Sequence, residues 1–142
     1  MDGIEYGMKR VLMGRVPQGG DLLEFLTQLC REKNLSLGVV WALGAVTQAN
    51  IGFYDQVEKR YCEVVFDREL ELTACQGNIS LKDGLPFVHL HANFGDRDGS
   101  TWSGHVMAGT NIFACEYTII ELTGEPLIRG LDPSTGLFLW RP

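Results

Sequence analysis

All three histidines of this 142-residue sequence lie in residues 87–106, the stretch FVHLHANFGDRDGSTWSGHV. If FVHLHANF is a β-strand, His89 and His91 project from the same face, about 7 Å apart, because side chains at i and i+2 share a face. The polar loop that follows returns the chain, so we expect His105 on a following antiparallel strand. Such an arrangement brings three imidazoles to one side of a sheet.

Three imidazoles on one face suit a divalent metal ion such as zinc. Three protein ligands leave the fourth position of zinc open for water or a substrate atom. Neutral imidazole also binds copper, iron and nickel, so another divalent metal stays an alternative. An H-x-H pair alone is also common in ordinary strand packing. The third histidine, with none elsewhere in the chain, favours a metal site made of His89, His91 and His105.

Three carboxylates are candidates for a catalytic role beside this metal. Asp96 and Asp98 lie in the loop between the two histidine segments, and Glu116 lies on the next predicted strand. A carboxylate in this position either orients an imidazole N–H or acts as a general base toward a metal-bound water. For the two aspartates, solvation of the loop is the simpler interpretation, and no feature of the sequence names a substrate.

An early helix is the first element expected to support this site. A strand over residues 6–16 and a turn precede Asp21, a predicted N-cap with Glu24 three residues later. Apolar residues then recur at helical spacing, and we expect the helix to end near Asn34. The members of this apolar stripe are Leu22, Phe25, Leu26, Leu29 and Cys30. We expect the helix to cover the core.

Strand patterns dominate the rest of the chain. Apolar or alternating segments predict strands at residues 37–46, 49–55, 60–66, 69–81, 87–94 and 113–122, with a final strand or docked arm at 135–142. Gly77-Asn78 predicts a bulge or bend. One helix and many strands joined by short turns predict a single α+β domain over residues 1–142. We expect a mainly antiparallel sheet with the amphipathic helix packed on it.

Charge and composition narrow the classes of function. The net charge is −6 and the 12 basic residues are scattered, which argues against DNA binding by this chain alone. The longest apolar segment, residues 35–46, is about half of the roughly 20 residues that a membrane helix needs. No secretory signal is visible. Four widely spaced cysteines without a C-x-x-C pair predict reduced core thiols in a cytoplasmic protein.

The segment VHLHANFGDRDGSTWSGHV, followed by ACEYTIIEL, resembles the plants and prokaryotes conserved domain, usually abbreviated PPC. The similarity extends over most of the chain. GRVPQGGDLLEFLTQLCREKNL is similar to the early strand, turn and helix of the family, and LELTACQGNISL resembles its segment with Glu71, Gly77 and Asn78. The H-x-H and the later G-H are the most specific parts of the resemblance.

The resemblance implies an α+β fold with an antiparallel sheet, and association as a homotrimer. It also implies that His89, His91 and His105 match the metal ligands of some members. In plants the domain accompanies AT-hook motifs that hold DNA, and stand-alone prokaryotic members carry a DNA-binding label by analogy. This chain has no Arg-Gly-Arg-Pro hook, which puts that label in doubt.

Three hypotheses about function follow. The first is a trimeric regulatory or ligand-sensing protein with zinc on the three histidines, in which apolar segments such as residues 35–46 are buried by self-association. The second is a metal-dependent enzyme that uses metal-bound water on a small molecule. The third is a DNA-associated assembly module whose histidines are structural.

Overall fold

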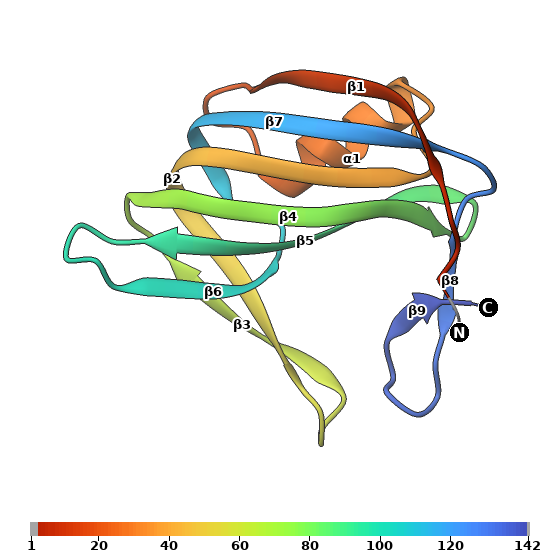
Figure 1. Ribbon diagram of the computed structural model, residues 1–142. Helices are drawn as coiled ribbons and strands as arrows, with labels where there is room; N and C mark the ends of the chain where they lie inside the picture. The colour runs from red at the N-terminus through yellow and green to blue at the C-terminus, as the bar shows by residue number, and fades with distance from the viewer. Residues whose placement is uncertain (1–2, 142) are drawn as a thin grey trace.

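The structure, a computed structural model, describes residues 3–141, which form nine strands and one helix (Figure 1). In chain order these are β1 (Gly7–Val16), α1 (Leu22–Glu32), β2 (Gly38–Asp55), β3 (Arg60–Phe66), β4 (Leu70–Lys82), β5 (Leu85–Gly95), β6 (Thr101–Val106), β7 (Asn111–Thr123), β8 (Ile128–Leu131) and β9 (Phe138–Trp140). One sheet contains every strand, in the order β1-β7-β2-β6-β5-β4-β8-β9, with β3 paired to β2. Only the β4–β8 pairing is parallel among the described strands. The predicted α+β class is confirmed.

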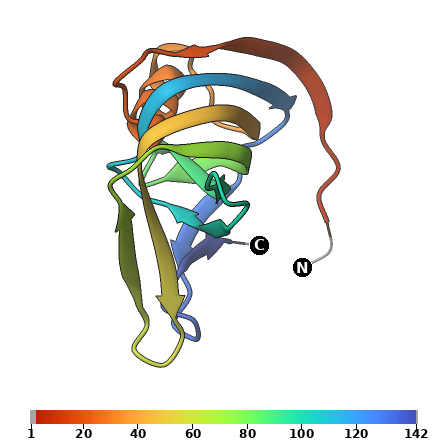
Figure 2. The ribbon, with the colours of Figure 1, turned by 90° about the vertical axis from the view of Figure 1, so that its left-hand side faces the viewer.

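Helix α1 begins where the sequence predicts. Asp21 is the N-cap in an extended conformation, and its side chain accepts the N–H of Glu24 at 2.8 Å. The helix ends at Glu32, slightly before the predicted end, and Asn34 then turns the chain with a φ of 54°. Leu22, Leu26, Leu29 and Cys30 are buried, so the amphipathic stripe faces the core. In Figure 1 the helix lies behind β7 and β2, and Figure 2 shows it on the inner side of the curved sheet.

Strand β2 corrects the prediction of two strands at 37–46 and 49–55. It is one strand of 18 residues. Its first half pairs with β4 and β7, and its second half pairs with β3 and β6. Register shifts between Ala42 and Gly44, and around Val46, mark bulges that bend a strand. After this bend, β2 and β3 leave the main sheet as a long hairpin (Figures 1 and 2).

The bend predicted at Gly77-Asn78 is wrong, because the β4–β5 ladder runs unbroken there. The irregularity on β4 lies between Leu72 and Ala74. Gly77 instead allows β5 to approach closely, since a Cβ at this position would lie 1.8 Å from the carbonyl oxygen of His89. The short strand β8 was not predicted.

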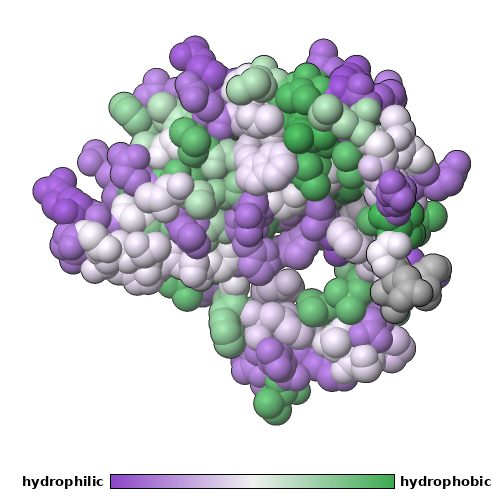
Figure 3. Space-filling model, viewed as in Figure 1, coloured by the Kyte–Doolittle hydropathy of each residue, from purple (hydrophilic) through white to green (hydrophobic). Residues whose placement is uncertain are grey.

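The core lies between α1 and the inner face of the sheet. On β2, Val40 and Ala42 are buried, whereas Trp41 and Leu43 alternate with them and are exposed by 46% and 59%. This alternation leaves the helix-free face of the sheet partly apolar. Figure 3 views that face, and hydrophobic side chains gather over β1, β7 and β2.

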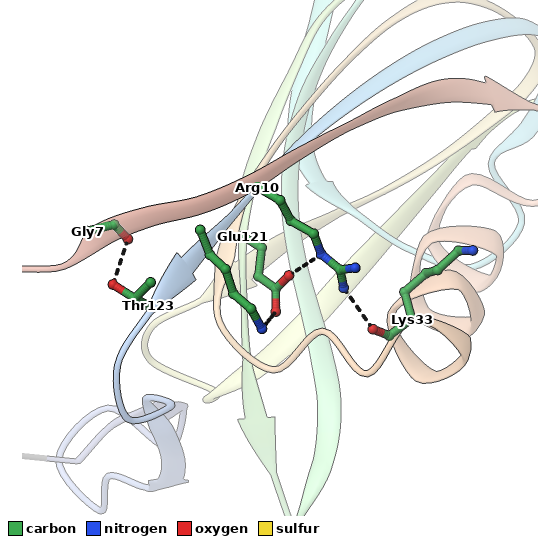
Figure 4. Close-up of polar contacts among 6 residues, drawn as sticks. Gly7, Arg10, Lys33, Glu121 and Thr123 are labelled. Carbon is green, nitrogen blue, oxygen red and sulfur yellow. Dashed lines mark hydrogen bonds and ion pairs between the residues drawn. The ribbon is translucent and has the colours of Figure 1, made fainter.

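A buried carboxylate ties the N-terminal strand to the sheet (Figure 4). Glu121 on β7 is only 4% exposed, and it accepts hydrogen bonds from Lys9, at 2.9 Å, and from Arg10. Arg10 also donates to the carbonyl of Lys33 at the end of α1. Burial pushes the pKa of Glu121 up, but the hydrogen bonds and charges of Lys9 and Arg10 outweigh burial, so the pKa lies below its ordinary value.

The four cysteines are free thiols. Cys30, Cys75 and Cys115 are buried, as predicted, and burial raises the pKa of Cys30 and Cys75 to about 12. Cys62 is only partly buried, because it lies on β3 away from the main core. Between residues 3 and 141 no helix has both the length and the apolar character needed to cross a membrane.

Candidate functional site

Strands β5 and β6 present the three histidines. On β5, Val88 and Leu90 are buried in the core, so His89 and His91 project from the opposite face. Strand β6 runs antiparallel to β5, and His105 lies directly opposite His91 in the register. Residues directly opposite one another in an antiparallel pair share a face. The predicted placement of the three residues is therefore what the structure shows.

The three imidazoles converge. One ring nitrogen of each lies within 4.8 Å of the others. The ring centroids are 5.1 Å apart for His89 and His91, 4.9 Å for His89 and His105, and 5.5 Å for His91 and His105. In a tetrahedral site with zinc–nitrogen distances of about 2.0–2.1 Å, the ligand nitrogens lie about 3.3–3.4 Å from one another. Each nitrogen–nitrogen distance therefore has to shorten by at most about 1.5 Å to reach the spacing of zinc ligands.

One ring nitrogen of His105 is in an environment that packing alone does not explain. Its Nδ1 atom is buried and has no hydrogen-bond partner among the described residues. A buried polar atom without a partner costs about 1–3 kcal/mol. A metal ion bound by this cluster is a group that would satisfy a ring nitrogen, so the donor set fits a metal.

Two of the histidines, His89 and His105, are neutral at neutral pH. Burial, followed by the charges of His105, Arg129 and His91, lowers the pKa of His89 to about 4. Burial, followed by the charges of His91 and Arg129, lowers the pKa of His105 to about 4. Imidazole binds metal through the lone pair of its neutral form. Both residues are therefore free of a competing proton at pH 7.

A tyrosine that the sequence analysis missed completes one side of the cluster. The ring of Tyr61, on β3, lies 4.9 Å from the ring of His105 and 5.0 Å from that of Tyr54. Burial and the neighbouring Tyr54 raise the pKa of Tyr61, so its phenol stays protonated. The bend in β2 brings β3 back to this position, and no sequence pattern predicts that bend.

The candidate carboxylates are not brought to the histidines. Asp96 pairs with Arg68 at 3.1 Å, and Asp98 accepts the N–H of Ser100, both in the turn beyond β5. This turn begins five residues past His91, which corresponds to about 17 Å along a strand. Glu116 is exposed on β7, opposite Leu43 of β2.

The three histidines thus stand alone as potential ligands. Over residues 3–141 they form the one group of three or more His, Cys, Asp or Glu side chains close enough to hold a metal.

Sequence comparison places the chain in a family. Residues 3–123 match the Plants and Prokaryotes Conserved (PCC) domain, and the chain belongs to this family. The resemblance found in the histidine segment is confirmed.

Solved structures share the fold over nearly the whole chain. A metal-containing protein from Archaeoglobus fulgidus is 36% identical, with a TM-score of 0.95 and 100% of both chains covered. The plant- and prokaryote-conserved (PPC) protein of Pyrococcus horikoshii is 30% identical, with a TM-score of 0.94 and coverage of 100% and 98%. A "putative dna binding protein" from Bacteroides thetaiotaomicron, 24% identical with a TM-score of 0.86 and 96% of each chain covered, shares the fold.

One curated relative is much longer than this chain. The chain is 33% identical over 132 residues to the Bifunctional protein GlmU of Synechococcus sp. (strain JA-3-3Ab). The match covers 92% of this chain and 20% of that protein. The chain therefore spans about a fifth of the length of this relative.

Proposed function

We propose that this protein binds one divalent metal ion, zinc, through His89, His91 and His105, and that it acts as a regulatory or ligand-sensing protein. The observation that carries the proposal is the convergence of three imidazoles, together with a buried Nδ1 of His105 that has no partner among the described residues. The Archaeoglobus fulgidus relative, described as metal-containing, supports it. A bound zinc ion supplies a Lewis-acidic centre with a coordination position that the three histidines do not fill.

Metal analysis of the purified protein tests this proposal. We expect one zinc ion per chain after dialysis against zinc and then against metal-free buffer. His91→Ala should lose the metal, because two imidazoles rarely hold zinc tightly. Asp98→Asn is the matched control, since Asp98 is exposed and lies outside the cluster. Equal metal content in wild type and His91→Ala would refute the ligand assignment.

We further propose that the chain assembles as a homotrimer through the helix-free face of the sheet. Val11 and Met13 on β1, and Trp41 and Leu43 on β2, are exposed by 49%, 78%, 46% and 59%. Contiguous exposed apolar side chains mark interaction sites in soluble proteins. Light scattering should give a trimer for wild type and a monomer for the double variant Met13→Glu, Leu43→Glu. A double variant that stays trimeric would place the interface elsewhere.

A metal-dependent enzyme acting on a small molecule is the second candidate. Tyr61 favours it, because a protonated phenol beside His105 is placed as a proton donor. Asp96, Asp98 and Glu116 stay predictions as general bases, since none joins the cluster within one chain. Hydrolysis of p-nitrophenyl acetate should require zinc and should fall in Tyr61→Phe. Equal rates for zinc-loaded wild type and Tyr61→Phe would count against this candidate.

DNA binding is the weakest of the alternatives. The net charge of −6 opposes attraction to phosphates, and the support comes from the names of solved structures that are 24% and 23% identical. We expect no retardation of random duplex DNA in electrophoresis at moderate salt. Tight, salt-sensitive retardation would contradict this expectation. The cytoplasmic location also stays a prediction from the cysteines.

A further inference from the structure

A cavity of about 340 Å³ adjoins the histidine cluster. His89 and His105 line one of its sides. The cavity lies between the sheet and two hairpins, β2–β3 and β8–β9, which both extend below the sheet in Figure 1. The hydroxyl of Tyr54 donates to the carbonyl of Thr135 at 2.7 Å, and this bond joins the two hairpins. In Figure 3 the molecule is hollowed in this region.

Arg129 of β8 is a buried cation on the wall of this cavity, with 9% of its surface exposed. It donates to Ser80 Oγ at 2.8 Å, to the carbonyl of Phe138 at 2.9 Å and to Asn78 Oδ1 at 2.7 Å. Asn78 lies directly opposite His89 in the β4–β5 register, which holds the guanidinium beside the cluster. A guanidinium has five N–H donors, so two are left for another acceptor.

The three hydrogen-bond acceptors of Arg129 are all neutral. Within the described chain no carboxylate forms an ion pair with Arg129, and no acidic side chain lines the cavity. Lys82 adds a further cation, with its Nζ 3.6 Å from the centre of the Phe138 ring, and Lys59 and Arg60 also line the cavity. Buried charges in proteins are normally paired, because an unpaired one costs several kcal/mol. The concentration of unpaired positive charge points to an anion as the missing partner.

Aromatic side chains form much of the remaining wall. Tyr54, Tyr61, Phe87 and Phe138 line the cavity, and the Arg129 guanidinium lies 4.9 Å from the centre of the Phe87 ring. Ligand sites typically combine apolar and aromatic walls with a few charged groups that fix orientation. An inorganic ion would cover little of this apolar wall, whereas an organic anion with an apolar body would cover more of it.

We propose that this cavity binds a small organic carboxylate with an aromatic or apolar body, its carboxylate held by Arg129 and Lys82 and its body directed toward His89 and His105. This inference names the class of ligand that the metal site would sense, and it rests on the proposed metal function for that role.

Calorimetry on the zinc-loaded protein tests the inference with three probes. Benzoate should bind, whereas benzamide, a neutral compound of nearly the same shape, should bind at least tenfold more weakly. Inorganic phosphate should also bind at least tenfold more weakly than benzoate, because it has no apolar body. Benzamide or phosphate binding as tightly as benzoate would overturn the proposed ligand class.

Two variants test the residues. Lys82→Gln should weaken benzoate binding about tenfold, which corresponds to about 1.4 kcal/mol. Arg129→Lys keeps the charge but loses the fork of donors, and it should weaken binding at least as much. Lys33→Gln, an exposed lysine next to α1, is the matched control and should leave binding unchanged. Benzoate affinity unaltered by Lys82→Gln would overturn the inference, even if Arg129→Lys failed to fold.

The same titration separates this inference from the proposed metal function. If zinc binds to His89, His91 and His105 but benzoate does not bind, the inference about the cavity fails and the metal proposal stands. If benzoate binds and zinc does not, the metal proposal fails, and with it the sensing role assigned to the cavity.

Discussion

Glu121 and Arg129 are both buried charged residues, but only one of them is neutralised within the chain. Glu121 is 4% exposed and accepts from two cations, Lys9 and Arg10, which tie β1 to β7. Arg129 is 9% exposed, and its hydrogen bonds within residues 3–141 go to neutral acceptors. Both form hydrogen bonds within the chain, but only Glu121 has partners of opposite charge.

This difference separates the scaffold from the site. The charge of Glu121 has its partners in the fold, and Glu121 does not line the cavity, which agrees with a structural role. The charge of Arg129 is unbalanced, and it lines the cavity that His89 and His105 also line. Within the histidine cluster, His105 has a buried nitrogen without a hydrogen-bond partner among residues 3–141. Arg129 and His105 therefore lie in the same region, and this is where we propose that the metal ion and the organic carboxylate bind.

The largest effect should come from removing a metal-binding residue from the histidine cluster. His105→Ala should lower zinc affinity by more than about a hundredfold, because altering a residue that merely supports a metal ligand already costs about 10–100-fold. Competition with a fluorescent zinc chelator measures the affinity. Circular dichroism of the metal-free variant controls for folding. Unchanged affinity would remove His105 from the ligand set.

The converse change is Glu121→Gln in the scaffold. It removes a charge-assisted pair of hydrogen bonds, and we expect the free energy of unfolding to fall by about 1.5–3 kcal/mol. Urea denaturation measures the loss. Zinc and benzoate affinities should stay at wild-type values, because Glu121 lies outside the cavity. A variant that kept its stability but lost ligand affinity would reverse the assignment of scaffold and site.

Lowering the pH should distinguish the histidine cluster from the Glu121 region, because each loses its contribution to the free energy of unfolding over a different pH range. The pKa of His89 and His105 is lowered from 6.5 to about 4, so below pH 6.5 the unfolded chain takes up protons that the folded chain does not. The metal-free protein should therefore lose stability as pH falls from 6.5 to 4. We expect a loss of about 1–2 kcal/mol, less than two separate shifts would give, because the two residues are coupled and partly screened.

Glu121 loses its contribution to the free energy of unfolding at a lower pH than the histidines do. Its pKa lies below 4.5, so its contribution is complete above pH 4.5 and is lost as pH falls through the folded value. Urea denaturation at a series of pH values measures both ranges. His89→Asn should flatten the profile between pH 6.5 and 4, and Glu121→Gln should not. Identical profiles for wild type and His89→Asn would contradict this account.

The smallest effects should come from the carboxylates outside the cluster. Asp98→Asn and Glu116→Gln should each change zinc affinity by less than about twofold, since screened charges at a distance contribute little. The chelator competition used for His105→Ala measures this. A tenfold loss in either variant would show that the carboxylate reaches the metal, which for Glu116 requires a neighbouring copy of the chain.

The sequence predicted the parts of the site that depend on local periodicity. The alternation along β5 fixes the common side of His89 and His91, and a short polar loop brings back His105. The N-cap at Asp21 follows from a similarly local signal. The positions of the candidate carboxylates could not be judged from the sequence, because closeness in sequence does not measure where a hairpin ends. Asp96 and Asp98 lie in the turn, several residues beyond the histidines.

The parts that depend on long-range geometry were not predictable. Tyr61 reaches His105 only because bulges bend β2 between its two halves. Arg129 reaches the cluster because β8 pairs in parallel with the end of β4, a contact between residues far apart in the sequence. No periodicity signals such a pairing. The cavity therefore depends on the tertiary fold, whereas the histidine cluster forms within one hairpin, β5–β6.

The most direct test of the central claim is a crystal structure of the purified protein with anomalous scattering recorded at the zinc edge. We predict one anomalous peak per chain, bonded to a ring nitrogen of each of His89, His91 and His105 at about 2.0–2.1 Å. A zinc-soaked crystal without a peak at these residues, or with the peak bonded to other side chains, would contradict the claim.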